Sequence, residues 1–213
     1  LTRPDLIPPQ TRTVNILDVS KLLLEPKLNP PVNAVFIYNH NLVIVHPNQN
    51  LMKQALARTD LFTVGIDIVM TDSMKYADIV LPACSHFEHD DIFASYGQQY
   101  LQRAEAVIRP VGESLPNTEI FRRLASAFDF HDACFKSSDQ ELMNDALDAE
   151  DQRMQGYEPC RLPTDLALKM TATSSSGNAD NTEEPILFDN IFPDTPSGKV
   201  ELYSESLKRE YNL

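Results

Sequence analysis

Short apolar runs that stop at polar residues set the pattern of the first part of the chain. They occupy 33–38 (NAVFIY), 61–66 (LFTVGI) and 78–81 (DIVL). Most residues of each run are apolar, and many of them favour β-strands. This composition is typical of strands that are covered on both faces of a sheet. We therefore expect three buried strands.

Segments with helical spacing separate and follow these runs. After Pro47, apolar residues recur at helical spacing up to Arg58, and Thr71 can cap a short helix that runs through Tyr76. A strong helix begins at Asn117, with an apolar stripe made of Ile120, Phe121, Leu124 and Phe128. Strands that alternate with helices predict a parallel, right-handed sheet of the α/β class.

The pattern divides the chain into five segments. Residues 171–185 have almost no apolar side chain and predict a flexible linker, because such a segment cannot offset the entropy cost of ordering. The other segments are a proline-rich connector with one helix (1–32), the sheet with its helices (33–130), an acidic helical insertion (131–170) and the start of a C-terminal region (186–213). Alternation predicts a short β segment at 199–203 (KVELY), and 101–108 is expected to be extended.

Composition narrows the choice of partners. The 213 residues carry a formal net charge of −13, and the Lys and Arg residues form no run. Nucleic acid is not expected as a partner, since phosphate contacts need clustered basic side chains. No apolar run approaches the roughly 20 residues that cross a bilayer, so we expect no membrane insertion. Three widely spaced cysteines favour a reducing compartment, and the start at Leu1 indicates a segment of a longer polypeptide.

Polar side chains follow the predicted strands. Asn39 and Asn41 come after the first strand, and Asp67 comes after the second. In a parallel sheet these ends share one edge, where a carboxylate can accept hydrogen bonds from a guanine or a ribose. The alternative is that these residues only satisfy the backbone of turns. No glycine-rich phosphate-binding loop is present to decide between the two interpretations.

The stretch HFEHDD, from His86 to Asp91, has the residue types of a metal site. A metal centre needs ligands that converge, and no second cluster elsewhere in the sequence completes a shell. We therefore favour a solvated or hydrogen-bonded loop here. Cys84 is similarly expected to be a packed side chain at a strand end and not a nucleophile.

Several ordered blocks resemble the molybdopterin-dependent oxidoreductases of the dimethyl sulfoxide reductase and formate dehydrogenase type. The blocks are NPPVNAVFIYNHN, PNQN, LFTVGIDIVMTDSMKYADIVLPACSHFEHDD, PVGES with Asn117, and FPDTPSGKVELYSE, of which ADIVLP followed by Glu88 is the most specific. The resemblance implies a partial domain with a three-layer, Rossmann-like parallel sheet. It also implies a bis-molybdopterin guanine dinucleotide cofactor with molybdenum or tungsten, and it allows an iron–sulfur cluster upstream of this segment.

The resemblance also assigns roles to individual residues. It places the guanosine end of one dinucleotide at the strand ends, with cofactor-binding positions at Asn39, Ile66, Asp67, Thr71, His89 and Asn117. Asp67 would recognise the guanine or the ribose, and His89 stands where some relatives have a lysine near the phosphates. Thr71 and Glu88 would support the loop geometry. No catalytic residue and no metal ligand is assigned within this chain.

The leading hypothesis is a segment of a molybdopterin oxidoreductase that binds the guanosine end of the cofactor. Its partners would be the remainder of the same catalytic subunit and electron-transfer subunits, and its compartment the cytoplasm, or the periplasm if a signal precedes it. Leu42, where many relatives have proline, and the altered loop FASYGQ invite an alternative. In that alternative the region keeps the fold, has lost the cofactor and serves as a structural subunit of an electron-transfer complex. A third hypothesis is an independent α/β domain that binds an ordinary nucleotide.

Overall fold

The computed structural model describes residues 11–94, 96–147 and 151–170, together with 193, 195, 197–203, 205 and 208–209. The chain divides into two compact units. Unit 1 comprises 1–91 and 104–143, and unit 2 comprises 92–103 and 144–213. The five segments that the sequence suggests are a different partition of the chain, and they stay a prediction. Across the described residues, no helix combines the length and the apolarity that a membrane crossing requires.

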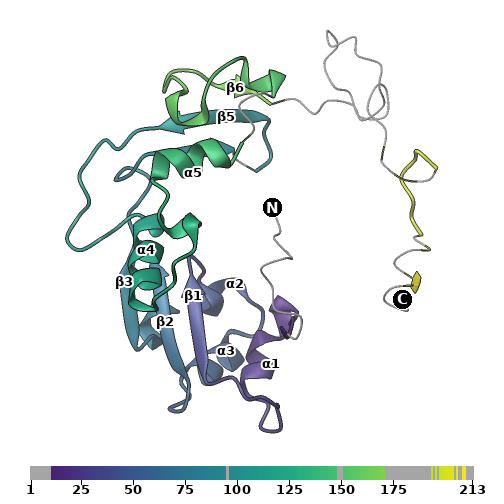
Figure 1. Ribbon diagram of the computed structural model, residues 1–213. Coiled ribbons are helices and arrows are strands. Elements are labelled where there is room, and N and C mark those ends of the chain that lie inside the picture. The colour runs from purple at the N-terminus through teal and green to yellow at the C-terminus, as the bar shows by residue number, and fades with distance from the viewer. Residues whose placement is uncertain are drawn as a thin grey trace. The chain divides into compact units, whose positions relative to one another are not determined.

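Unit 1 is built on a three-stranded parallel sheet (Figure 1). Its strands are β1 (Ala34–Tyr38), β2 (Phe62–Asp67) and β3 (Ile79–Pro82), in the order β1-β2-β3. Tyr38 lies opposite Ile66, and Asp67 lies opposite Pro82, so the three strands end almost level with one another. The predicted parallel α/β sheet is therefore confirmed.

Helices cover both faces of this sheet. Adjacent residues of a strand point to opposite faces, so each strand contributes side chains to the packing on both sides. Ile37 packs on one face against Leu23, Met52 and their neighbours, whereas Ile66 packs on the other face against Ile120. The helices and 3-10 turns of the first face are η2 (Ile16–Asp18), α1 (Val19–Leu23), α2 (Leu42–Val45), α3 (Gln49–Leu56) and η3 (Met74–Tyr76), and α4 (Asn117–Ala127) covers the second face. The result is a three-layer arrangement.

The predicted stripe of α4 explains its packing. Ile120 is buried against Ile66 and Ala83, and Leu124 packs at the edge of the same cluster. Phe121 contacts two aromatic residues of β1, with ring centroids 5.2 Å from Tyr38 and 6.1 Å from Phe36. Phe128, the last residue of the predicted stripe, lies beyond the helix as its C-cap and is 67% exposed.

Arg122 of α4 contacts the acidic segment that follows this helix. Arg122 donates to the backbone oxygen of Ser137 at 2.9 Å and to Asp139 Oδ1 at 2.6 Å. A helix, α5 (Asp139–Asp145), and a 3-10 turn, η4 (Ala133–Phe135), form this segment. Among the described residues of 131–147, helical structure is thus limited to these two short pieces.

Unit 2 contains a second small sheet, in the order β4-β5-β6. Leu101 of β5 lies opposite Leu168 of β6 in antiparallel pairing, and both are buried with Met154 and Leu162. The elements are β4 (Asp91–Ala94), β5 (Tyr100–Ala104), η5 (Gln152–Met154), η6 (Pro159–Arg161) and β6 (Leu168–Lys169). The extended segment predicted at 101–108 is therefore a strand in its first part only.

Two expectations concern the C-terminal part of the chain. The short β segment predicted at 199–203 is wrong, because these residues form bends and irregular backbone. A strand requires a neighbour that takes up its backbone hydrogen bonds, and the described residues pair none with this segment. The linker predicted at 171–185 lies outside the described residues.

The packing of β2 against η3 yields a first prediction. A Cβ added to Gly65 would lie 2.2 Å from Met74 Sδ, and the Met74 side chain is 1% exposed, with little room to move. Gly65→Ala should therefore lower the free energy of unfolding by about 1–3 kcal/mol through overpacking, as measured by urea denaturation. The control is a double-mutant cycle with Met74→Val, which shortens the neighbouring side chain. Strictly additive costs in the cycle would contradict a collision between these two positions.

Candidate functional site

The carboxyl ends of β1, β2 and β3 form one edge of unit 1. Parallel pairing continues past β3, because Ala83 forms a parallel bridge with Leu115, two residues before α4 begins at Asn117. Asn39, Asp67, Ala83 and Leu115 therefore follow one another across the edge. We call this row, with the loops that extend from it, the carboxyl edge.

Asn39 turns the chain at the end of β1. Its backbone N–H donates to the carbonyl oxygen of Ile66 at 3.0 Å, and its φ of 48° lies in the left-handed region. Asparagine tolerates this conformation better than most residues do, so the chain can leave the sheet abruptly here. The Asn39 side chain is exposed as a result.

Asp67 presents a carboxylate at the middle of the edge. Its Oδ1 accepts a hydrogen bond from the N–H of Ile68 at 2.8 Å, and its carbonyl oxygen accepts from the N–H of Ala83 at 3.1 Å. Among the described residues, Oδ2 has no hydrogen-bond partner. The side chain is half-buried. The hydrogen bond from Ile68 orients the carboxylate, and Oδ2 remains available.

Ile66, also a predicted binding residue, faces the core. Its side chain is 0% exposed and packs against Ile120 of α4. Only its backbone takes part in the edge, through the carbonyl that accepts from Asn39. The Ile66 side chain therefore anchors the strand that carries Asp67.

Buried polar contacts tie the loop after β1 to the loop after β2. Ser73 is 0% exposed, and its hydroxyl donates to Asn41 Oδ1 at 2.8 Å and accepts from the N–H of Val43 at 2.9 Å. Thr71 Oγ1 accepts from the N–H of Met74 at 3.4 Å, which fixes the turn into η3. Asn41, named at first as a possible ligand contact, thus uses its side-chain oxygen to join the two loops.

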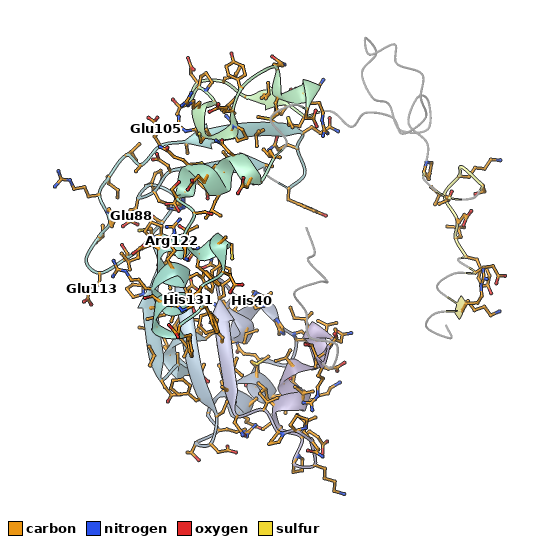
Figure 2. The ribbon with its side chains drawn as sticks, in the orientation of Figure 1. His40, Glu88, Glu105, Glu113, Arg122 and His131 are labelled. Carbon is orange, nitrogen blue, oxygen red and sulfur yellow. The ribbon has the colours of Figure 1, made fainter. Side chains whose placement is uncertain are left out.

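A buried carboxylate shapes the loop after β3. Glu88 is 8% exposed and accepts four hydrogen bonds: from the N–H and hydroxyl of Ser85 at 2.7 and 2.6 Å, from the N–H of Val111 at 2.6 Å and from the hydroxyl of Ser114 at 3.2 Å. These bonds, those from Ser85 first, lower the pKa of Glu88 to about 2. The expectation that Glu88 supports loop geometry agrees with these contacts. Figure 2 labels this residue.

His89 and Cys84 have their own local partners. His89 Nδ1 lies 2.9 Å from the carbonyl oxygen of Ser85, and Nε2 lies 3.5 Å from Asp91 Oδ2. Cys84 is buried, and burial raises the pKa of its thiol, which contacts the Ser114 hydroxyl at 3.7 Å. A thiol with a raised pKa is a poor nucleophile at neutral pH. Among the described residues, no group of three His, Cys, Asp or Glu side chains is placed to hold a metal ion.

Asn117 begins α4 next to the edge. Its side-chain Oδ1 is buried and has no hydrogen-bond partner among the described residues. A buried amide oxygen without a partner costs free energy, so it marks a place where a further donor would be favourable. Asn117 follows the Leu115 bridge to Ala83, which puts it on the same side of the sheet as the end of β3.

Most of the predicted binding residues lie at or beside the carboxyl edge, but they contribute to it in different ways. Asn39 and Asp67 present side chains, Asn117 keeps an unpartnered oxygen, Thr71 shapes a turn and Ile66 is sealed in the core. Sequence reasoning missed Ser73 and the pair formed by His40 and His46. Ser73 contacts a residue that is distant in the sequence, and the two histidines contact each other across α2. No sequence motif predicts either contact.

Comparison with known proteins now identifies the family. The model of the family described as "Molybdopterin oxidoreductase" matches residues 14–127, which is more than half of the chain. The chain belongs to the molybdopterin oxidoreductase family. The resemblance stated from the strand and loop motifs is thereby confirmed.

Curated relatives of this molybdopterin oxidoreductase segment are much longer than the segment. A probable oxidoreductase of Bacillus subtilis, YoaE, is 42% identical over 99% of this chain and 29% of its own length. A putative formate dehydrogenase of Staphylococcus haemolyticus is 28% identical over 80% of this chain and 18% of its own. The chain therefore spans less than a third of the relatives it matches.

A solved structure shares the fold. Acetylene hydratase from Pelobacter acetylenicus superposes with a TM-score of 0.60 at 23% identity, covering 91% of this chain and 24% of that chain. At this level of identity the likeness supports the fold alone. The observed sheet is thus part of a fold that recurs in a larger protein.

The bridge between the two loops yields a second prediction. Ser73→Ala removes one buried donor and one buried acceptor, leaving Asn41 Oδ1 and the N–H of Val43 without this partner. The free energy of unfolding should fall by about 1–3 kcal/mol, as measured by chemical denaturation. Ser126→Ala, at an exposed position of α4, is the matched control and should change stability by less than about 0.5 kcal/mol. Equal effects of the two substitutions would contradict a role for the Ser73 hydroxyl.

The Glu88 carboxylate yields a third prediction, on pH. Its pKa in the folded state, about 2, lies below the ordinary 4.5, so the stability it contributes is complete above pH 4.5 and is lost as the pH falls toward 2. Glu88→Gln should lower the melting temperature at pH 7. The melting temperature of this variant should also fall less steeply than that of the wild type as the pH is lowered from about 4.5 to 2. Glu113→Gln changes an exposed carboxylate nearby in the sequence and should leave that decline intact. A Glu88→Gln variant with the acid profile of the wild type would refute the assignment.

Proposed function

We propose that this chain is the part of a molybdopterin-dependent oxidoreductase that holds the guanosine end of a molybdopterin guanine dinucleotide at the carboxyl edge. The family supplies the cofactor class, and the relatives supply the context of a longer catalytic chain. The observation that carries the finer proposal is Asp67, a half-buried carboxylate at the end of the central strand with Oδ2 unpartnered among the described residues.

The chemistry of Asp67 fits a guanine or a ribose. A carboxylate accepts hydrogen bonds only, and guanine offers the adjacent N1–H and exocyclic amine as two donors. Because Oδ1 already accepts from Ile68, Oδ2 is the oxygen available to such a group. Charge-assisted bonds of this kind are stronger than neutral ones, so one aspartate can contribute substantially to retention of the nucleotide.

Two amides at the same edge support the proposal. The side chain of Asn39 is exposed at the end of the neighbouring strand and can both donate and accept. Asn117 Oδ1 is buried and lacks a donor among the described residues. Asn117 Oδ1 and the Asp67 carboxylate can accept hydrogen bonds, and the Asn39 amide can both accept and donate, which suits the donors and acceptors of a nucleoside. Thr71 shapes the turn beside them, and Ile66 fixes the strand from the core side.

The role of the chain would be to hold and orient the cofactor. When bound, the molybdenum or tungsten pterin supplies the redox chemistry, and the residues described here fix its distal nucleotide. The bis form of the cofactor, an iron–sulfur cluster and electron-transfer subunits belong to the same proposal for the whole protein. His89, whose Nε2 lies 3.5 Å from Asp91 Oδ2, belongs to the same proposal as a residue near the phosphates of the cofactor.

The Asp67 proposal yields a fourth prediction. Asp67→Asn keeps the oxygen that accepts from Ile68 and removes the charge, so the fold should persist while the nucleotide loses an acceptor. We expect the content of guanine nucleotide and pterin per purified intact protein to fall by about tenfold to a hundredfold, the equivalent of one charge-assisted hydrogen bond. The measurement is release and quantification of the cofactor, together with molybdenum analysis.

Asp60→Asn is the matched control. Asp60 precedes β2 at the opposite end of the strand and forms an exposed pair with Arg58 at 2.7 Å, so its loss should leave cofactor content unchanged. Undiminished content in Asp67→Asn would remove Asp67 from the site. A wild-type protein that carries neither molybdenum nor pterin would instead support the alternative of a structural subunit that has kept the fold.

A further inference from the structure

The loop after β2 exposes three consecutive apolar side chains. Ile68, Val69 and Met70 directly follow Asp67 and are 55%, 62% and 61% exposed. Single apolar side chains on a surface are normal, but adjacent ones that remain open to water often mark a binding surface. The position of these three residues, next to a carboxylate of the carboxyl edge, indicates which kind of molecule binds there.

The backbone of this loop is fixed although its side chains are exposed. The N–H of Ile68 donates to Asp67 Oδ1 at 2.8 Å, and the N–H of Thr71 donates to the carbonyl oxygen of Val69 at 2.8 Å. Thr71 Oγ1 in turn accepts from the N–H of Met74, whose side chain is buried in the core. An ordered turn therefore presents the apolar side chains, which lowers the entropy that a contact would cost.

A second apolar segment lies at the same edge. Ile44 and Val45 of α2 are 53% and 64% exposed. The Ser73 hydroxyl accepts from the N–H of Val43, so a buried hydrogen bond ties α2 to the segment that follows Met70. The carboxyl edge thus combines a few hydrogen-bonding groups with exposed apolar side chains, which is the usual composition of a small-molecule site.

A purine has the shape and the chemistry that this combination requires. Its donors and acceptors lie at the rim of the ring, whereas its two faces bind by stacking on aromatic or apolar side chains. A rim donor that pairs with Asp67 Oδ2 places the ring within reach of the residues that follow Asp67 in the chain. A thioether such as that of Met70 also makes favourable contacts with aromatic rings.

The loop offers little to a charged ligand. Residues 68–70 carry no charge, and the next basic residue along the chain, Lys75, pairs with Asp72 at 2.7 Å. Covering the three side chains with the face of a ring removes apolar surface from water and is favourable. The loop therefore favours an uncharged, planar group.

We propose that Ile68, Val69 and Met70 form an apolar platform on which the purine ring of the nucleotide lies. The platform rests on the proposed function, because Asp67 holds the rim of the same ring. It adds a contact to the face of the ring, which is distinct from the hydrogen bonds at the rim. Loss of either contact should weaken retention of the nucleotide.

Oxidation of Met70 in the intact protein tests the platform. Mild hydrogen peroxide converts an accessible methionine into its sulfoxide, which mass spectrometry of peptides detects. The protein that carries its cofactor is compared with the same protein produced in a host that cannot make molybdopterin. Met70 should be oxidised several-fold more slowly in the cofactor-bound protein, because the ring covers its sulfur.

Met74 is the internal control, since its side chain is 1% exposed in the same part of the chain. It should resist oxidation in both forms, because the loop stays folded without the cofactor. Equal oxidation of Met70 in the two forms would overturn the platform, whether the residue is open in both or is covered in both by another part of a longer protein. Oxidation of Met74 in the empty protein would also count against it, because local unfolding would then explain the difference.

A pair of substitutions measures the contribution of the platform. Val69→Ser with Met70→Gln should release the nucleotide from the intact protein about tenfold faster, the equivalent of one lost apolar contact. The matched control is Val107→Ser with Ile108→Gln, at positions 72% and 50% exposed in a different loop of unit 1, and it should leave release unchanged. Equal release rates from the two double variants would contradict the platform.

Asp67→Asn separates this inference from the proposed function. If Asp67→Asn loses the cofactor while Val69→Ser with Met70→Gln keeps it, the nucleotide binds at the carboxyl edge without the platform, and this inference alone is wrong. If neither variant loses the cofactor, or if the wild type carries none, the platform and the proposed function are both wrong.

Discussion

Parallel pairing of β1, β2 and β3 is the constraint on which the other features depend. Parallel strands place all their carboxyl ends at one edge, and the register of Tyr38 with Ile66 and of Asp67 with Pro82 makes those ends level. The bridge of Ala83 to Leu115 extends the row to the start of α4. Residues separated by up to about eighty positions thereby become neighbours at one edge of the sheet, which is the usual place for ligands in open α/β sheets.

Buried polar contacts give this edge its shape. Ser73 joins the loops after β1 and β2, and Glu88 joins the loop after β3 to the segment before α4. A loop with such contacts is costly to move, because each opening leaves buried donors and acceptors unpaired. These contacts therefore hold the loops of the edge in place.

The sequence predicted the strands and α4 well because their signals are local. Continuous apolar runs and an apolar stripe follow from the packing of single elements, and each needs only its own neighbours in the chain. The contacts of Glu88 with Val111 and Ser114 cross 23 and 26 residues, and that of Ser73 with Asn41 crosses 32. Patterns of apolar spacing carry no information about such pairs. The segment 199–203 shows the converse, since its alternation is local but a strand also requires a partner.

The charges around the carboxyl edge bear on the proposal that the guanosine end of the cofactor binds there. Phosphates are bound by free cations or by exposed N–H groups, and several cationic side chains around the edge already have acidic partners. Lys75 pairs with Asp72 at 2.7 Å, Arg122 pairs with Asp139 at 2.6 Å, and His89 Nε2 lies 3.5 Å from Asp91 Oδ2. A phosphate here would have to compete with these carboxylates in a chain whose net charge is −13. An uncharged nucleoside would meet no such penalty, and its donors could pair with the oxygen that Asp67 leaves available, which supports the proposal that the guanosine end of the cofactor binds here.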